Sequence, residues 1–227
     1  MGDFKGFSKD GLAFLKQLAR NNNKAFFEAY KPAYVEGIVE PGKAFVVELA
    51  SALQASVSED LVAEPRVNGS LFRIHRDVRF SKDKTPYKTH QAMFIWEGES
   101  KKTSSGFYMQ IDADEVMLGV GGMGLPNLDR WRAALDDHAS GAAFDRAIAQ
   151  AEKKLGTLSY PEPGLKRVPK PYAADHPRGD WLRMKGFHAG ARMKAPASIT
   201  SAKFVDWCAR RFAHFGPLHT WLVENLQ

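Results

Sequence analysis

Residues Arg73 to Tyr87 read R-I-H-R-D-V-R-F-S-K-D-K-T-P-Y, and this stretch brings charge, aromatic side chains and a turn signal together. If the stretch is a strand as far as Phe80, successive side chains point to opposite faces of a sheet. Alternation then gives a mostly apolar face and a charged face, which are Phe72, Ile74, Arg76, Val78 and Phe80 and, opposite them, Arg73, His75, Asp77 and Arg79. The pattern therefore predicts a strand whose core face carries one arginine.

That arginine, Arg76, requires a partner. A guanidinium stays protonated in proteins, so burying it calls for a carboxylate or several carbonyl oxygens nearby. The residues after Phe80 are turn formers, and Pro86 favours an extended residue before it, so we expect the strand to end there and a loop to follow. Asp83 in that loop is a candidate partner for Arg76 or Arg79.

The charged face and its loop together suit an anion held by several donors, since loops on a rigid sheet often carry binding groups. The hypothetical ligand-binding set is Arg73, Arg76, Asp77, Arg79, Lys82, Asp83, Lys84, Tyr87, Lys166, Arg167 and His176. Two other interpretations stay open. The charges can form an ordinary solvated surface, or they can pair with one another in an internal network.

The motif also resembles a known family. Arg73-x-x-Arg76-Asp77-x-Arg79-Phe80 followed by Asp83-Lys84-x-x-Tyr87 is similar to the signature of the bacterial family catalogued as domain of unknown function 2461. Further matches extend the resemblance over nearly the whole chain; these are Asn21-Asn22-Asn23 before an aromatic pair, Gly121-Gly122, Leu165-Lys166-Arg167 and Asp175-His176-Pro177.

One part of the chain departs from the family pattern. Lys24, Ala25 and Phe26 stand where the family pattern has an arginine, an acidic residue and a tryptophan, which argues against a site at that helix start. The resemblance implies a shared fold unit and a cytoplasmic setting. It assigns no biochemical activity.

The positive charge is local. The formal net charge of the chain is +6. Residues 73–90 contribute +4 and residues 164–194 contribute +6, so the remainder sums to −4. Two separate basic windows are typical of a cleft for anions rather than of a uniformly basic surface. We therefore predict that the two windows converge in space to form a basic cleft.

Length and composition favour one α+β domain over residues 1–227. A chain of 227 residues can bury a large core, and its single cysteine, Cys208, excludes an internal disulfide. No apolar run approaches the roughly 20 residues of a membrane span, and Met1-Gly2-Asp3-Phe4-Lys5 lacks the apolar core of a signal peptide. We expect a cytoplasmic protein without a membrane partner; the sequence says nothing of its oligomeric state.

The periodicity divides the chain into three parts. Residues 1–57 are predicted to be helical, with Ser8 and Asn23 as N-caps, Pro32 as a kink or a helix start, and Pro41 opening a third helix. Residues from about 62 to 122 are predicted to form an antiparallel sheet of four or more strands, including 93–96, 105–112 and 115–120. Residues 126–227 are predicted to be helical around a basic, proline-rich loop at 160–180.

Several motifs have a functional and a structural interpretation. Asp112, Asp114 and Glu115 can be oxygen ligands for a cation, although acidic residues in a tight turn are ordinary turn chemistry. Gly119-x-Gly121-x-x-Gly124 has dinucleotide-loop spacing but lacks the required strand-helix-strand context, which instead indicates a close-packed strand exit. His176 beside Asp175 suits acid/base chemistry or a local hydrogen bond. We predict no metal and no cofactor.

Three hypotheses follow for function. The first is a site for an anionic small molecule, with a phosphate-bearing one as a candidate and His75 or His176 as an optional proton carrier. The second is nucleic-acid binding through the same basic surface, with Tyr87 or Trp96 stacking on a base. The third is that the charged motif is an internal ion-pair network in a structural or interaction protein. Whether the protein is an enzyme stays open.

Overall fold

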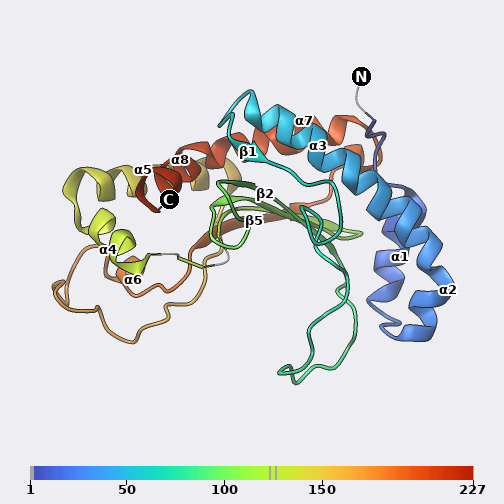
Figure 1. Cartoon of the computed structure of the whole chain (residues 1–227), viewed down its shortest axis with the longest axis horizontal. Coiled ribbons are helices and arrows are strands. Elements are labelled where there is room, and N and C mark those ends of the chain that lie inside the picture. The colour runs from blue at the N-terminus through green and yellow to red at the C-terminus, as the bar shows by residue number, and fades with distance from the viewer. Residues whose placement is uncertain (1–2, 123, 126, 227) are drawn as a thin grey trace.

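The computed structural model describes residues 3–122, 124–125 and 127–226 and has an α+β fold, as predicted. Helices precede and follow an antiparallel sheet (Figure 1). In chain order the elements are α1 (Lys9–Leu18), α2 (Lys24–Tyr34), the π-helical η1 (Val35–Val39), α3 (Glu40–Gln54), β1 (Leu61–Val62), β2 (Gln91–Glu97), β3 (Gly106–Ile111), β4 (Glu115–Gly121), α4 (Leu128–Asp136), α5 (His138–Leu155), α6 (Gly179–Leu182), β5 (His188–Lys194), the 3-10 turn η2 (Ala197–Thr200), α7 (Lys203–Phe212), the 3-10 turn η3 (Ala213–Phe215) and α8 (Gly216–Leu226).

Capping side chains begin the helices where the sequence predicts. The Ser8 hydroxyl accepts the N–H of Gly11, and the Asn23 side chain accepts the N–H of Phe26. Pro32 lies inside α2, which leads through η1 directly into α3, so neither a break nor a new helix begins at Pro32. Pro41 occupies the first turn of α3, directly after the π-helical η1.

The sheet is antiparallel in the order β1-β2-β3-β4-β5. Strands β2, β3 and β4 confirm the predicted 93–96, 105–112 and 115–120. The fifth strand, β5, lies in a region predicted to be helical or loop, and that prediction is wrong. The β5 sequence H-A-G-A-R-M-K is rich in alanine and glycine, which have low strand propensity, so its pairing with β4 decides its conformation.

Helices cover one face of the sheet. In Figure 1 the sheet is seen nearly edge-on, with α3, α7 and α8 above it, and these helices contact strands β2 and β4. The covered face is apolar and buried: Met93, Ile95, Phe107, Met109, Ile111, Val116, Leu118, Val120, Ala189 and Ala191. Burial of this face at roughly 25 cal/mol per Å² is the main term that stabilises the fold.

Between Leu71 and Lys88 the chain leaves the sheet as a projecting arm, defined here as residues 73–87 (Figure 1). The predicted strand from Arg73 to Phe80 is wrong, because the arm contains only one isolated bridge, between His75 and Tyr87. The Asp77 and Asp83 carboxylates accept the backbone N–H groups of Arg79 and Thr85. These local bonds, together with Pro86, which has no N–H, replace a regular ladder.

The base of the arm is fixed to the helical layer. The Asn22 side chain bonds the backbone of Tyr87 twice, accepting its N–H at 3.0 Å and donating to its carbonyl at 2.8 Å. The Tyr87 ring stacks on Phe27 with centroids 4.2 Å apart. Buried Gln91 accepts the Tyr34 hydroxyl and donates to the carbonyl of Phe72, the residue just before the arm, so this amide joins α2 and β2 to the start of the arm.

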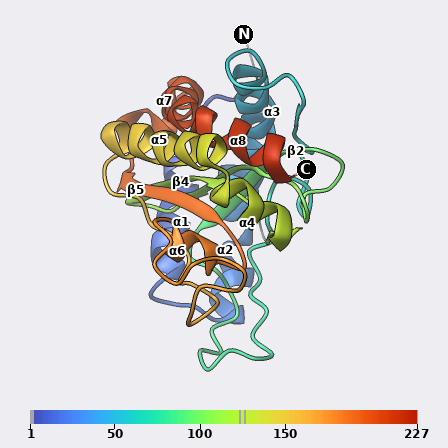
Figure 2. The same cartoon turned by 90° about the vertical axis from the view of Figure 1, so that its left-hand side faces the viewer.

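A second projection is formed by the basic loop, defined here as residues 160–178. Figures 1 and 2 both place it on the same side of the sheet as the arm. The loop is fixed where it leaves and rejoins the helices, by a hydrogen bond from Tyr160 to Glu152 and an ion pair of Arg178 with Asp145. In the described part of the chain, no helix has the length and apolar character needed to cross a membrane.

Asn22→Ala should destabilise the protein by about 1–3 kcal/mol, because two backbone groups of Tyr87 at the arm base lose their partner. The free energy of unfolding in urea measures the effect. Asn21→Ala is the matched control, since the exposed Asn21 side chain lies after α1 and donates to the carbonyl of Gln17 in that helix. Equal unfolding free energies for the two variants would contradict the anchoring role of Asn22.

Candidate functional site

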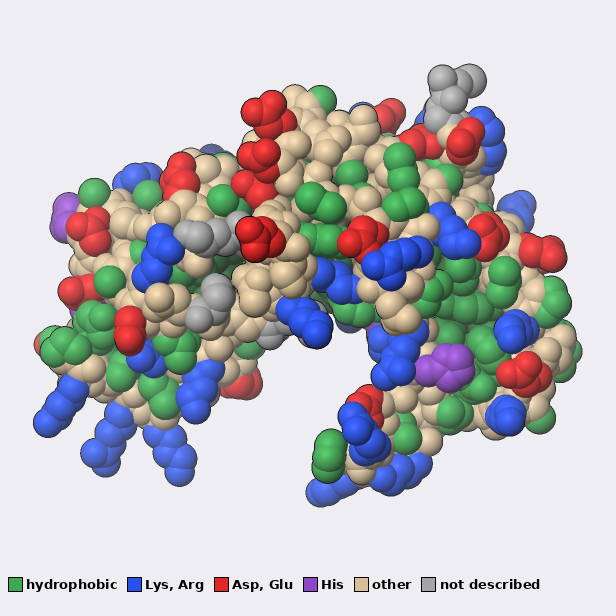
Figure 3. Space-filling model, viewed as in Figure 1, with side chains coloured by type: hydrophobic (Ala, Val, Ile, Leu, Met, Phe, Trp, Pro, Cys, Tyr) green, Lys and Arg blue, Asp and Glu red, His purple; other side chains and the backbone are tan. Residues whose placement is uncertain are grey.

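The arm and the basic loop, which carry parts of the two basic windows, lie on opposite sides of one notch. The space-filling view in Figure 3 shows Lys and Arg side chains gathered on two projections, with the underside of the sheet hollowed between them. One projection is the arm, and the other is the basic loop with exposed Lys166, Arg167 and Lys170. The windows thus face the same space without forming one continuous patch.

Within the arm, Arg76 has the acidic neighbour that the sequence predicts. Its guanidinium lies 2.5 Å from Asp83 and also donates to the hydroxyl and the carbonyl of Thr85. The N–H of Thr85 and the Arg76 guanidinium together hold the pKa of Asp83 at about 2. Arg76 therefore links the two stems of the arm, and its donors are directed inward.

A second internal pair lies nearer the tip. Arg79 donates two hydrogen bonds to Asp77, which lower the pKa of that carboxyl to about 2. Lys84 donates to the carbonyl of Val78 at 2.9 Å. Lys82 is exposed and forms no salt bridge with any described residue. Arg76, Asp77, Arg79 and Asp83 from the hypothetical ligand-binding set are therefore paired with one another.

Two aromatic residues are not where nucleic-acid stacking requires them. Tyr87 and Trp96 are each only 4% exposed, so the prediction that either stacks on a base is wrong. The Tyr87 ring packs against Phe27 and His75 instead. Tyr87 is an anchor of the arm, which a tyrosine in a turn sequence did not indicate.

His176 is held by two partners, and neither is its neighbour Asp175. Its Nε2 lies 3.3 Å from Asp136 at the end of α4, and its Nδ1 accepts the N–H of Arg178. The ring thus ties the basic loop to α4, which is the local hydrogen-bonding role. Of the two interpretations of His176, the structure supports the local hydrogen bond, with Asp136 and Arg178 as partners in place of Asp175.

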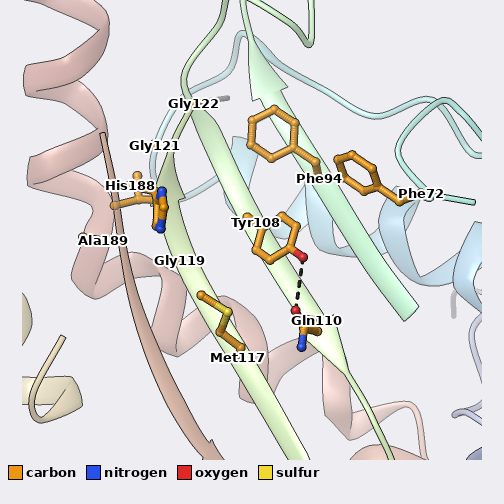
Figure 4. A pocket seen from close by; sticks show the side chains of 11 residues that line it. Phe72, Phe94, Tyr108, Gln110, Met117, Gly119, Gly121, Gly122, His188 and Ala189 are labelled. Carbon is orange, nitrogen blue, oxygen red and sulfur yellow. Dashed lines mark hydrogen bonds between the residues drawn. The ribbon is translucent and has the colours of Figure 1, made fainter. Parts of the chain in front are cut away.

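The uncovered face of the sheet carries a cavity of about 400 Å³ (Figure 4). The strand register places Phe94, Tyr108 and Gly119 in one cross-strand row, so two aromatic rings lie beside a residue that has no side chain. Gly119 has no room for a Cβ, which would lie 2.8 Å from the carbonyl oxygen of Ala189. The remaining lining residues are Phe72, Gln110, Met117, Val120, Gly121, Gly122, His188 and Ala189.

Cations gather at the Phe72 edge of this cavity. Lys88 Nζ lies 5.6 Å and Lys101 Nζ 4.5 Å from the Phe72 ring centroid. Burial lowers the pKa of both ammonium groups, and Arg73 lowers that of Lys88 further. Lys88 donates to the carbonyl of Arg73 at 3.0 Å. Arg73, Lys88 and Lys101 form no salt bridge with any of the described residues.

His90 lies beside this cationic edge. Burial, followed by the neighbouring charge of Lys88, lowers the pKa of His90 to about 4, against the opposite effect of Asp112. Arg192, which also lowers the His90 pKa, is paired with Glu115 at 3.0 Å. His90 is thus neutral at pH 7 and adds no charge to the edge.

A buried serine, histidine and glutamate form a chain elsewhere in the fold. His219 Nε2 lies 2.8 Å from Glu97, and its Nδ1 lies 3.4 Å from the Ser105 hydroxyl. The order resembles a hydrolytic triad, but His219 is 1% exposed and the cavity beside Ser105 has a volume of only about 10 Å³. The chain joins α8 to β2 and β3, and it offers no space for a substrate.

The other chemical candidates serve structural ends. The Asp112 carboxylate accepts the N–H groups of Asp114 and Glu115, whereas Asp114 pairs with Lys16. Among the described residues, no group of three or more His, Cys, Asp or Glu side chains gathers in a way that could hold a metal ion. Cys208 is fully buried, and burial raises the pKa of its thiol well above the usual value, which opposes a nucleophilic role.

Sequence reasoning missed the cavity and its cationic edge. The alternation that places Phe107, Met109 and Ile111 in the core also places Tyr108 and Gln110 on the other face. The residues on this second face, together with the glycines of β4, would have indicated a hollow there. The role of Lys88 had no comparable signal, because its distance to Phe72 depends on how the arm leaves the sheet.

The family of the chain is clear from comparison with known proteins. The model of the family described as "Conserved hypothetical protein (DUF2461)" matches residues 10–221, so this chain belongs to that family. A search of curated proteins gave no match. Membership agrees with the resemblance seen in the motif, and it brings no assigned activity with it.

Arg76→Ala should increase the rate of tryptic cleavage within the arm several-fold, because the link between its two stems is lost. The urea midpoint should change little, since most residues of the arm do not contact the hydrophobic core. Lys82→Ala is the matched control because it also removes one tryptic site but no cross-link. Gel analysis of cleavage over time decides the point, and equal rates for both variants would show that the arm does not depend on Arg76.

The free energy of unfolding should fall as the pH drops from 6.5 towards 4. In that window the unfolded chain binds a proton at His90 whereas the folded protein does not, so acid favours unfolding. The pKa values of His188 and His219 are lowered in the same direction. His90→Gln should reduce the slope of stability against pH, measured by urea unfolding across the window. His138→Gln, at an exposed position of α5, controls for replacing an imidazole.

Proposed function

We propose that this DUF2461 protein binds a small anionic molecule with a flat, apolar part. The flat part lies in the cavity on the uncovered face of the sheet, and the anionic group contacts Arg73, Lys88 and Lys101. The observation that carries the proposal is Lys88, a partly buried ammonium at the cavity edge that forms no salt bridge with a described residue.

The shape and lining of the cavity support a flat ligand. Its volume of about 400 Å³ lies within the usual range for small-molecule sites, which are mostly apolar with a few polar groups. Glycines 119 and 121 leave the floor without side chains, while the rings of Phe94 and Tyr108 rise beside it (Figure 4). A planar ring can lie on such a floor and contact the neighbouring aromatic side chains.

The electrostatics support an anion at the Phe72 edge. Removing an ammonium group from water costs free energy unless an opposite charge or hydrogen-bond acceptors replace the water. Lys88 has one carbonyl acceptor, and the adjacent Arg73 opposes its charge rather than stabilising it. A carboxylate or phosphate at this point would relieve both effects. Unpaired, partly buried charges of this kind mark binding sites more often than ordinary surface.

The proposal changes the membership of the ligand-binding set predicted from the sequence. Arg76 and Arg79 have their own carboxylates, and Tyr87 is buried in the arm base. Arg73 keeps its place in the set, and Lys88 and Lys101 join it. The histidine at the edge, His90, has the ordinary hydrogen-bonding capacity of a neutral imidazole for a ligand group.

The test is isothermal calorimetry with benzoate, 2-naphthoate, nucleoside 5′-monophosphates and inorganic phosphate. A ring-bearing anion should bind more tightly than phosphate, and Lys88→Ala should weaken it about tenfold or more, as expected for a charged hydrogen bond of roughly 1.5–3 kcal/mol. Lys153→Ala, at an exposed position of α5 away from the cavity, should leave affinity unchanged. Binding that does not distinguish these two variants, or no binding by any of the four probes, would contradict the proposal.

A further inference from the structure

The tip of the arm exposes an aromatic ring to solvent. Phe80 is 96% exposed, which is the largest exposure among the large apolar side chains in the described part of the chain. The guanidinium of Arg79 lies 5.8 Å from the ring centroid, and exposed Lys82 and Lys84 follow in the chain. A ring in this position stabilises nothing in the fold, so its place at the end of a projection calls for another explanation.

The arm holds this ring in a defined place without a hydrophobic core of its own. Arg76 with Asp83 joins the stems, Arg79 with Asp77 closes the tip, and Lys84 caps the Val78 carbonyl. An aromatic ring loses little conformational entropy on binding, and less still when its backbone is already ordered. The two internal ion pairs, Arg76 with Asp83 and Arg79 with Asp77, thus hold the backbone around Phe80 in place.

The opposite wall of the notch carries a matching charge. Lys166, Arg167 and Lys170 are exposed on the basic loop, and none of them forms a salt bridge with a described residue. Figure 3 shows the positive side chains of both projections extending past the hollow of the sheet. A partner that contacts both walls must be anionic at several points and long enough to span them.

We infer that the notch binds a single strand of nucleic acid, with phosphates against both basic walls and a base stacked on Phe80. The regularly spaced phosphates of a strand can contact the positive side chains of both walls, and an unpaired base can stack on the exposed Phe80 ring. A second copy of the chain fits poorly, since the arm and the cavity edge are both positive. An anionic membrane would meet a single aromatic anchor, which is marginal for stable attachment.

This site differs from the one under Proposed function. It uses the arm tip and the basic loop, whereas the small-molecule site uses the cavity and the base of the arm. Failure of either leaves the other standing, because Phe80, Lys166 and Arg167 do not line the cavity.

The test is fluorescence anisotropy of the full chain with a labelled 20-nucleotide single strand at several salt concentrations. Phe80→Ala should weaken binding about tenfold, as loss of one stacked base implies. Phe80→Trp should retain it. Val47→Ala, which removes another exposed apolar side chain on α3, is the matched control and should bind as the unaltered protein does. Because Phe80 is exposed, its substitution leaves the fold intact, which a thermal melt verifies.

Removal of single positive charges from both walls provides an independent test. Each of Lys82→Ala, Lys166→Ala and Arg167→Ala should reduce the slope of log affinity against log salt by about 0.7, the value for one phosphate contact on a single strand. Equal affinity of Phe80→Ala and Val47→Ala for the strand would overturn the inference. So would binding to vesicles of 3:1 phosphatidylcholine and phosphatidylserine in the absence of any oligonucleotide binding, which would assign the tip to a membrane surface.

Discussion

The sheet has helices on only one of its faces, and the other features of the molecule depend on this asymmetry. The covered face is packed with side chains from β2 to β5, which removes a large apolar area from water. The uncovered face has to tolerate solvent, and it does so with glycines, a glutamine and a tyrosine among its apolar residues. The arm and the basic loop project on this uncovered side of the sheet. The hollow lies between these two projections because no helix fills the space there.

The charged stretch from Arg73 to Tyr87 mainly specifies the shape of the arm. Arg76 and Asp83 are needed together because each would be an unmatched charge without the other. The Tyr87 ring stacks on Phe27, and the Tyr87 backbone bonds Asn22, an asparagine more than sixty residues earlier in the chain. A long motif dense in charge thus describes a cross-linked projection. On the two projections, the positive charges that form no salt bridge with a described residue lie at the base of the arm, at its tip and on the basic loop.

Residues close together in the sequence were sufficient to predict helix starts, one strand of the sheet and the carboxylate partner of Arg76. Ser8 and Asn23 cap helices where predicted, the alternation of Phe107, Met109 and Ile111 gives a strand, and Arg76 finds a carboxylate. Two departures from the sequence pattern share one cause, which is that contacts distant in sequence outweighed a local pattern. His176 pairs with Asp136 rather than Asp175, and β5 forms on the edge of β4 despite its weak propensity. The predicted strand from Arg73 to Phe80 failed for a local reason, because Asp77 accepts the backbone N–H of Arg79, a donor that a ladder would have used.

The cations of this protein divide into two groups by what surrounds them. Arg76, Arg79, Arg178 and Arg192 each meet a carboxylate, so their positions are explained by the fold alone. Lys88 is not explained in this way. An exposed lysine at its position would avoid the desolvation that lowers its pKa, and an apolar residue would pack on Phe72 without that cost. A partly buried charge that meets no carboxylate among the described residues, beside a cavity whose floor is backbone, is the arrangement expected when an anion from solution completes the site.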